Sequence, residues 1–207
     1  MIPQKNKKFL VTLCSWSNPK ALKVCIDSLI KSRSSVEYDI AVVLNEADQE
    51  SMEYLTKEKI YFFASPFNHG PLAIDFLNPL ISLYEYVMNS NDDMVFYKGF
   101  AEDIIGLMDS GKFCSASCSL VENFGGNNHC VAVDRSLSSI LEKDSVDRFL
   151  NNCESKKYSF DNLKISYNHP ICVRSKDWIS VGGYSDRWNS DFESGYGMDD
   201  YFAFKLI

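Results

Sequence analysis

Three short apolar segments, separated by stretches with helical character, most restrict the fold of this chain. They are residues 8–13 (KFLVTL), 38–44 (YDIAVVL) and 60–64 (IYFFA), each with the length and composition of a buried strand. Between the first two, apolar residues recur at the spacing of a helix packed on a sheet: Leu22, Cys25, Ile26, Leu29 and Ile30. A second helix-like segment reaches about Lys59. This alternation predicts an α/β fold with a mixed, mainly parallel central sheet flanked by helices.

Polar loops follow each predicted strand and mark one edge of the predicted sheet. The first loop, SWSNP, places Ser17 or Asn18 as the cap of a helix with Pro19 in its first turn. The loops NEADQES and SPFNHGP follow the second and third strands. Ligands of open α/β sheets bind outside the carboxyl ends of the strands, so these loops predict a binding edge. No GxGxxG follows the first strand, which argues against a dinucleotide-dependent oxidoreductase.

The second half of the chain has a less regular pattern. Residues 101–110 and 137–152 have helical character, residues 112–121 are strand-like, and residues 121–134 suggest a loop around a short strand. No internal repeat or linker divides the sequence. The 207 residues are therefore expected to form a single domain with its own core.

Charge and cysteine content exclude several classes of protein. A formal charge of -7 argues against a nucleic-acid partner, which would need a clustered basic surface. An acidic protein that binds phosphorylated small molecules usually needs a local cation, so a divalent metal site is expected. The 7 cysteines include no CxxC pair, which indicates reduced thiols rather than a disulfide framework or a zinc knuckle. The sequence shows neither a signal peptide nor a membrane-length apolar span, so we expect a cytoplasmic protein without membrane insertion.

Three segments of the sequence carry motifs that recur in one order in a known enzyme family. The first is VTLCSWSNPKALKVCIDSL, with a strand, a polar turn and a helix. The second runs from Asn68-His69-Gly70, an N-x-G loop, to the acidic stretch Asn91-Asp92-Asp93 and MVFYKGF. The third is GGYSDRWNSDFESGYGMDDYFAFKL, which ends in an acidic helix start. In this order they resemble the opening strand and helix, the N-x-G loop with the DXD-type motif, and the acceptor-side segment of the inverting family 2 glycosyltransferases. The resemblance implies the Rossmann-like GT-A fold of that family.

For the donor, the resemblance implies a nucleotide-binding half (residues 1–93) that holds a UDP-sugar with Mn2+ or Mg2+. Asp93 matches the last acid of the DXD-type motif and is the implied metal ligand, because hard cations prefer carboxylate oxygens. The implied nucleotide-sugar contacts are Ser15, Trp16, Asn45, Glu46, Asn68, His69, Asn91 and Asp92. Pro66 and Phe67 stand where the family commonly has a basic residue.

For the acceptor, the resemblance implies a second half (residues 94–207) that binds a glycan or another hydroxyl compound. Asp199 matches the position of the base that removes the acceptor's hydroxyl proton, and Asp200 is the second candidate. Gly182 and Gly183 would let the backbone approach a sugar. Tyr184 or Trp188 would stack on the sugar, or else belong to the core.

Two registers of the acidic motif remain open from the residues alone. Asn78-Pro79 is a good helix start, and Leu80, Leu83, Tyr84, Val87 and Met88 follow at helical spacing. If that helix reaches Asn89, the strand is residues 94–97 and the acids lie at its amino end. The spacing from Asn68 to Asp93 instead favours acids at the carboxyl end, although Asn89 and Ser90 are poor strand formers.

The expected function is therefore glycosyl transfer of a hexose or deoxyhexose, inverting, in glycan biosynthesis. A non-catalytic nucleotide-sugar or glycan-binding module is the alternative. The chain ends at Ile207 within the segment similar to the acidic helix, which suggests the first module of a longer protein.

Overall fold

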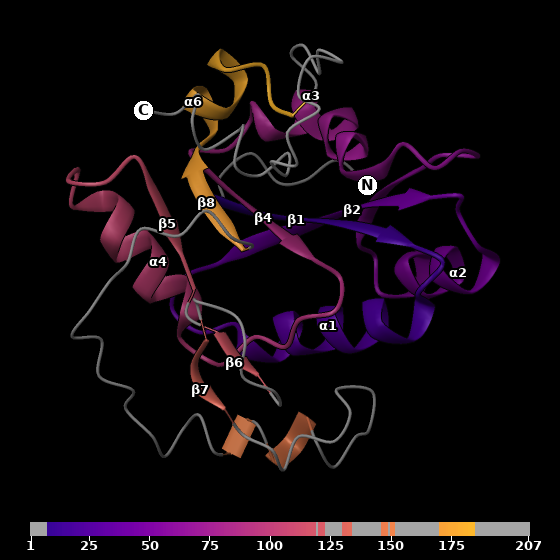
Figure 1. The fold of residues 1–207 in the computed structure, drawn as a ribbon, viewed down its shortest axis with the longest axis horizontal. Helices are drawn as coiled ribbons and strands as arrows, with labels where there is room; N and C mark the ends of the chain where they lie inside the picture. Colours follow the sequence, from indigo (N-terminus) through magenta and orange to yellow (C-terminus); the bar gives the residue numbers. More distant parts are fainter. Residues whose placement is uncertain are drawn as a thin grey trace.

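A six-stranded sheet in the order β3-β2-β1-β4-β8-β5 forms the centre of the protein (Figure 1). The computed structural model describes residues 8–118, 120–122, 130–133, 146–148, 150–151 and 170–184. The strands of this sheet are β1 (Phe9–Trp16), β2 (Tyr38–Asn45), β3 (Tyr61–Ala64), β4 (Tyr86–Asn91), β5 (Ser115–Ser117) and β8 (Ile171–Arg174). The helical elements are α1 (Pro19–Ser32), α2 (Gln49–Lys57), the 3-10 helix η1 (Gly70–Leu77), α3 (Asn78–Ile81), α4 (Phe100–Asp109) and α6 (Ser175–Ser180).

Strand direction follows the predicted pattern. β1 pairs in parallel with β2 and β4, and β2 pairs in parallel with β3. β8 runs antiparallel to β4 and β5, which makes the sheet mixed. The predicted mainly parallel α/β fold is confirmed. β1 extends to Trp16, three residues beyond the predicted segment, because Cys14 to Trp16 keep pairing with β2.

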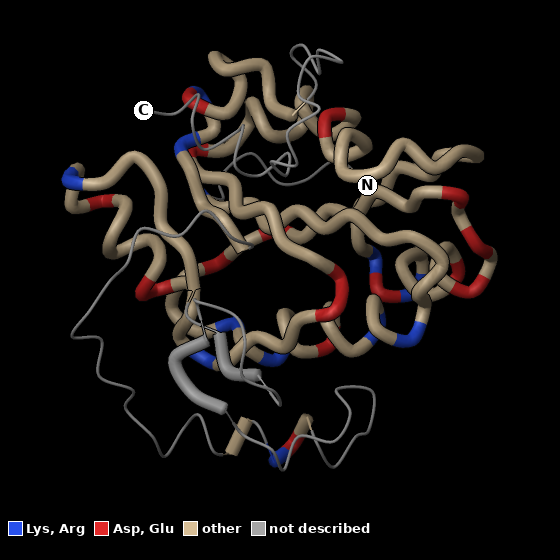
Figure 2. The backbone as a smooth tube through the Cα atoms, in the orientation of Figure 1, with Lys and Arg blue, Asp and Glu red and all other residues tan. Residues whose placement is uncertain are grey.

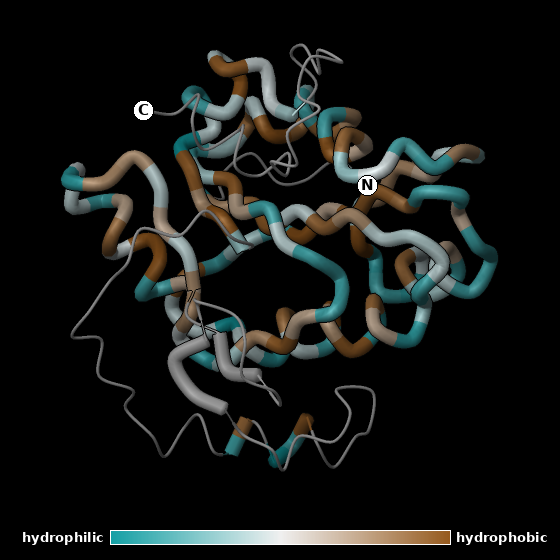
Figure 3. Tube along the Cα trace, viewed as in Figure 1, coloured by the Kyte–Doolittle hydropathy of each residue, from teal (hydrophilic) through white to brown (hydrophobic). Residues whose placement is uncertain are grey.

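Side chains from alternate positions of the strands build one apolar core on each face of the sheet. Phe9, Val11 and Leu13 of β1 pack toward α1, α2 and α4, whereas Leu10 packs toward η1, α3 and α6. Figure 1 shows α1 and α3 on opposite sides of the sheet, and Figure 3 shows hydrophobic residues (brown) both in the central strands and along the helices around them. The protein is therefore a three-layer sandwich of helices, sheet and helices.

The predicted helices of the first half are confirmed. α1 begins at Pro19, directly after Asn18, and buries Leu22, Cys25, Ile26 and Leu29. In α2, Asp48 caps the first turn by accepting a hydrogen bond from the Ser51 amide at 2.8 Å. The capped amide explains why the helix begins within the polar loop NEADQES.

The second half matches the prediction where it is described. α4 spans 100–109, close to the predicted 101–110. The strand-like residues 112–121 form two short strands, β5 and β6 (Leu120–Glu122), and β6 pairs in parallel with β7 (Cys130–Val133) in a second sheet. Of the predicted helix 137–152, residues 146–148 and 150–151 are described, and these are helical.

The register of the acidic motif is resolved by β4. Residues 86–91 form the strand, so Asp92 and Asp93 follow its carboxyl end, and the alternative strand at residues 94–97 is wrong. The helix that begins at Asn78 ends at Ile81, and Val87 and Met88 then pack on opposite faces of the sheet.

Asn89 is accommodated in β4 because buried polar partners surround it. Its Oδ1 accepts a hydrogen bond from the Thr12 hydroxyl at 3.3 Å, and its Nδ2 donates to the Tyr184 hydroxyl at 3.0 Å. A satisfied amide can stay in the core, which strand propensity alone does not reveal.

Two further properties bear on the sequence predictions. Five cysteines in the described part of the chain, Cys14, Cys25, Cys114, Cys118 and Cys172, are free thiols. A search of the helices within the described ranges finds none that has both the length and the apolar character needed to cross a bilayer.

Candidate functional site

The carboxyl ends of β1, β2 and β4 meet at one edge of the sheet. β1 lies between β2 and β4 in the sheet. After β1 the chain continues to β2 on one side, and after β4 it continues to the strands on the other side, so β1 and β4 flank a topological switch point. Figure 1 shows the arrowheads of β1, β2 and β4 pointing to the same side. Figure 2 shows Asp and Glu residues (red) along the loops that follow β2 and β4 at this side. The edge therefore combines the usual ligand position of the fold with negative charge.

On the face covered by α1, Ser15 and Asp92 form a hydrogen-bonded pair. The Ser15 hydroxyl, on a residue only 2% exposed, donates to Asp92 Oδ2 at 2.6 Å. Burial raises the pKa of the Asp92 carboxyl; the Ser15 hydrogen bond lowers it, and the adjacent Asp93 charge raises it. The half-buried Asp92 is thus held in one orientation beside the exposed Asp93.

The acidic turn offers oxygen ligands for a divalent cation. Asp93 is exposed and follows β4 by two residues, while Asn91 is exposed at the end of the strand. Within the described ranges, no three His, Cys, Asp or Glu side chains lie together as a metal-binding group. A magnesium ion in a nucleotide site usually takes one or two carboxylates from the protein and the remaining ligands from phosphates and water. Asp93 and its neighbour Asp92 fit that requirement.

On the opposite face, Asn45 connects three chain segments. Its Nδ2 donates to the Gly70 carbonyl at 3.0 Å and contacts Cys14 Sγ at 3.2 Å, and its Oδ1 accepts from the His69 amide at 3.2 Å. Burial, followed by the charge of Asp92, raises the pKa of the Cys14 thiol to about 12, so this group stays protonated at neutral pH. Asn45 thereby fixes the loop at residues 68–70 against the ends of β1 and β2.

Next to the Asn45 cluster, an exposed rim surrounds Glu46. The Trp16 indole donates to Glu46 Oε2 at 2.7 Å, and the Glu46 amide donates to the Phe67 carbonyl at 3.3 Å. Trp16 is 57% exposed and Phe67 is 67% exposed, so both rings offer open faces beside a carboxylate. Flat aromatic faces next to a hydrogen-bond acceptor suit a planar base that carries an N–H group.

The Gly182-Gly183-Tyr184 turn follows α6 and packs against η1. The Tyr184 amide donates to Asp75 Oδ1 at 3.1 Å, and its ring packs edge-on against Trp178 at 5.2 Å between centroids. Tyr184 is only 3% exposed, so it belongs to the core and does not present its ring for stacking on a sugar. Gly183 has a φ of +62°, and a Cβ there would lie 2.1 Å from Asp75 Oδ1. Here the missing side chain accommodates a carboxylate of the protein itself.

The structure brings together Ser15, Trp16, Asn45, Glu46, Asn68, His69, Asn91, Asp92 and Asp93 at one edge. Asn68 accepts a hydrogen bond from the Gly70 amide at 2.8 Å, which shapes the N-x-G loop internally. Trp188, Asp199 and Asp200 lie outside the described residues.

Two residues with important contacts are absent from the site that the sequence predicts. Phe67 stands where a basic residue is common in the family, but a large aromatic side chain in a polar loop is itself a signal of a binding surface. Asp75 is the single charged residue in the apolar stretch GPLAIDFL, and a lone acid in such a stretch is a sign of a buried carboxylate with partners.

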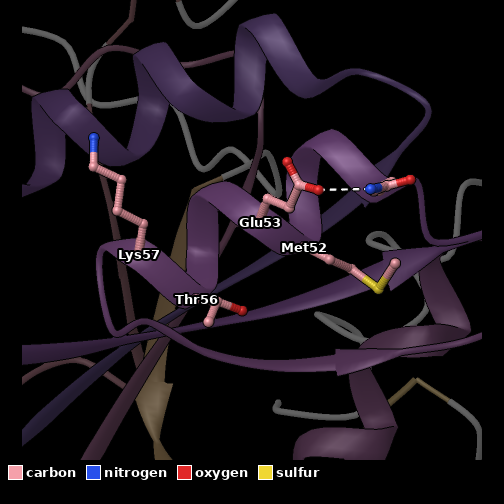
Figure 4. Close-up of a pocket in the computed structure, with 5 residues that line it drawn as sticks. Met52, Glu53, Thr56 and Lys57 are labelled. Atoms are coloured by element: carbon pink, nitrogen blue, oxygen red, sulfur yellow. Dashed lines mark hydrogen bonds between the residues drawn. The ribbon is translucent and has the colours of Figure 1, made fainter.

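A shallow cavity of about 390 Å³ lies on the surface of α2 (Figure 4). Gln49, Met52, Glu53, Thr56 and Lys57 line it, all from one helix. The Gln49 amide donates to Glu53 Oε1 at 2.6 Å, so the polar groups of this surface are partly paired with each other. The strand edge, where several elements converge, is the better candidate.

Comparisons with known proteins identify structural relatives only. No protein family model matches the chain, and no curated protein matches it. The structure of S. aureus TarS residues 1–349 in complex with UDP matches with a TM-score of 0.65 at 13% identity, covering 96% of this chain and 54% of that chain. The mannosyltransferase PcManGT from Pyrobaculum calidifontis, in complex with GDP-Man and Mn2+, matches with a TM-score of 0.59 at 12% identity, covering 99% of this chain and 53% of that chain.

The coverage and the sequence identity of these two matches limit what can be inferred from them. The chain spans about half the length of these two structures, and the similarity runs through nearly all of its own residues. At this level of identity, a structural match establishes the arrangement of elements and leaves the activity to be argued from the site. The chain therefore has the GT-A-like α/β fold of these structures.

Proposed function

We propose that this protein transfers a hexose or deoxyhexose from a UDP-sugar to a hydroxyl group of a glycan or a similar acceptor. The main support is the position of the acidic turn: Asp92 and Asp93 follow the carboxyl end of β4, next to the end of β1. In a GT-A-like fold this is the edge at which a nucleotide and a cation would meet. Structures with the same fold include one in complex with UDP and one in complex with GDP-Man and Mn2+.

The rim around Glu46 is the proposed base site. Trp16 and Phe67 provide aromatic faces for stacking, and the Glu46 carboxylate accepts hydrogen bonds, as the imide N–H of uracil requires. Asn68 and His69 lie in the adjacent loop, with exposed side chains that can reach the ribose or the diphosphate. An exposed, acidic rim of this kind suits the neutral base of the nucleotide and repels its negatively charged phosphates.

Asp93, assisted by Asp92, would hold Mn2+ or Mg2+ against the diphosphate. Such a cation, when bound, stabilises the negative charge that develops on the leaving nucleoside diphosphate. Ser15 fixes the orientation of Asp92, and Asn91 lies at the strand end beside the turn.

Acceptor activation is assigned to the segment beyond Tyr184. We infer that Asp199, with Asp200 as the alternative, removes the proton of the attacking hydroxyl, which would give inversion at the sugar. The turn from Gly182 to Tyr184, which precedes this segment in the sequence, contacts Asp75 and Asn89 through Tyr184.

Calorimetric titration of UDP with and without Mn2+, on wild type and Asp93→Ala, tests the donor site. We expect wild type to bind UDP more tightly with Mn2+, and the variant to lose most of that gain. Binding that neither depends on metal nor responds to Asp93→Ala would contradict the metal role.

Transfer assays with a panel of UDP-sugars then separate an enzyme from a binding module. Asp199→Asn is expected to retain UDP binding and lose transfer. If wild type binds UDP-sugars and transfers none of them to any acceptor or to water, the protein is a non-catalytic nucleotide-sugar-binding module.

A further inference from the structure

We propose that Asn45 is a positioning residue that prepares the loop at residues 68–70 for the nucleotide and does not itself read the base. This inference rests on the proposed function, since it concerns how the same site binds its donor. It follows from the three contacts that engage both polar atoms of the Asn45 side chain.

The backbone alone attaches this loop as far as Phe67. The Ser65 amide donates to the Leu44 carbonyl at 2.9 Å, the Ala47 amide to the Ser65 carbonyl at 2.9 Å, and the Glu46 amide to the Phe67 carbonyl at 3.3 Å. The Asn45 side chain continues the attachment beyond Phe67, to the His69 amide and the Gly70 carbonyl. Asn45, together with the Cys14 thiol that donates to the Gly70 carbonyl at 3.6 Å, therefore extends a backbone ladder around a turn that changes direction at Gly70, where φ is +59°.

Burial distinguishes Asn45 from its neighbour Glu46. Asn45 is 2% exposed and faces η1, whereas Glu46 is exposed and faces the rim with Trp16. An amide whose donor and acceptor are both engaged with the protein has little capacity left for a ligand. Contact with the base therefore belongs to the exposed rim, and Asn45 acts through the loop.

Fixing the loop before the ligand arrives lowers the entropy cost of binding. Removal of Asn45 contacts should raise the KM for the donor and the dissociation constant of UDP, with kcat at saturating donor little changed. This separation of KM from kcat is expected for a positioning residue of a binding loop and not for a group that acts on the reacting atoms.

Asn45→Asp provides the sharpest test because it changes one donor into an ionisable group. When protonated, the introduced carboxyl can still donate to Gly70 and accept from His69, as the amide does. When ionised, it faces the Gly70 carbonyl with a buried negative charge. Burial raises the pKa of such a carboxyl. The titratable group in contact with it is the protonated Cys14 thiol from β1, and the charge of Asp92 after β4 also acts on that thiol.

UDP affinity of Asn45→Asp should therefore depend on pH more steeply than that of wild type. We expect near-wild-type binding at about pH 5 and a dissociation constant raised about tenfold or more at pH 8, since a buried unsatisfied acceptor is costly. Wild type measured over the same range corrects for titration of the nucleotide and for every other pH effect that the two proteins share. Equal pH profiles for the two proteins would overturn the proposal.

Ser32→Ala is the matched control for a general loss of stability. Ser32 is as buried as Asn45, and its hydroxyl bonds with the Tyr38 hydroxyl at 2.8 Å, at the opposite end of β2. This variant should bind UDP like wild type at every pH.

Amide hydrogen exchange in the absence of nucleotide separates this proposal from the proposed function. In Asn45→Leu, the His69 amide should exchange at least about tenfold faster than in wild type, because it loses its acceptor. Unchanged exchange would refute the positioning role even if UDP binds. If the exchange accelerates but wild type binds no nucleotide, Asn45 does hold the loop in place. The proposed function would then be wrong, and so would the role of the loop in nucleotide binding.

Discussion

At the scale of single residues, the face of a strand decides what a polar side chain does at the binding edge. Ser15 and Cys14 are neighbours on β1, yet Ser15 bonds with Asp92 on the side of α1 while Cys14 contacts Asn45 on the side of η1. Successive side chains of a strand point to opposite faces, so adjacent residues belong to separate clusters. Both buried clusters support exposed groups next to them, Asp93 in one case and His69 in the other.

Ser15→Ala tests the first of these clusters. Loss of the hydroxyl leaves the Asp92 carboxylate without the donor that orients it and lowers its pKa. A hydrogen bond to a charged group contributes about 1.5 kcal/mol, which is about a tenfold change in an equilibrium constant. We expect the Mn2+ dissociation constant in the presence of UDP to rise about 5–10-fold, measured by the electron paramagnetic resonance signal of free Mn2+. Ser15→Thr should restore most of the affinity, and equal affinities for wild type and Ser15→Ala would show that the hydroxyl has no role in metal binding.

Gly183→Ala tests the turn after α6. The added methyl group would lie 2.1 Å from Asp75 Oδ1, on a backbone with positive φ that alanine disfavours. We expect a loss of about 2–4 kcal/mol in the free energy of unfolding, measured in urea. Gly106→Ala is the control, because that site is helical and open, and it should gain about 0.5–1 kcal/mol. A Gly183→Ala protein as stable as wild type would mean that η1 and the turn separate easily.

At the scale of elements, Glu102 connects α4 to the loop between α1 and β2. Its Oε1 accepts hydrogen bonds from the Ser34 hydroxyl, from the Ser35 amide at 2.7 Å and from the Val36 amide at 3.2 Å. Burial opposes ionisation, but these hydrogen bonds outweigh it and lower the pKa of Glu102 to about 2. A carboxylate in the first turn of a helix also compensates unpaired amides and the helix dipole.

This shift predicts a defined loss of stability in acid. Because the pKa is lower in the folded state than the value of about 4.3 in an unfolded chain, the stabilisation is complete above that value and is lost as pH falls toward about 2. Glu102→Gln should be less stable than wild type at pH 7, and the difference should disappear near pH 2. The measurement is urea unfolding as a function of pH. A difference that stays constant across this window would exclude the charge as the cause.

The sequence predicts best those elements that pack one apolar face against the core and expose the other. α1 has one apolar stripe and a proline at its start, and its bounds follow from them. β4 was ambiguous because Leu80 to Met88 fits a helical stripe, and only the buried partners of Asn89 explain why an amide lies inside a strand. The site residues of β1, β2 and β4 could be grouped from strand ends, but the internal partners of Ser15 and Asn45 depend on tertiary contacts. Asp75 was missed for the same reason, since its partner Tyr184 is 109 residues away in sequence.

At the scale of the whole molecule, the binding edge connects the two helical layers that cover opposite faces of the sheet. The acidic turn is fixed from the α1 side and the loop at residues 68–70 from the η1 side, and the Glu46 rim connects the ends of β1 and β2 through Trp16. A nucleotide that contacts all three would link elements on both faces of the sheet. Its binding energy should therefore add to the stability of the sheet as a whole and not to one loop.

Thermal unfolding with nucleotide and metal tests this prediction. A ligand that binds only the folded state at 100 times its dissociation constant stabilises it by about 2.7 kcal/mol, which corresponds to about 5–10 °C for a domain of this size. We expect UDP with Mn2+ to raise the Tm of wild type in one cooperative transition, and UDP alone to raise it less. Asp93→Ala should reduce the effect of Mn2+ while keeping the effect of UDP, because the Glu46 rim is intact. The contrary result is unfolding in two steps, with UDP raising the temperature of the first step alone. The base site would then be coupled to one face of the sheet, and the two sides of the edge would unfold independently.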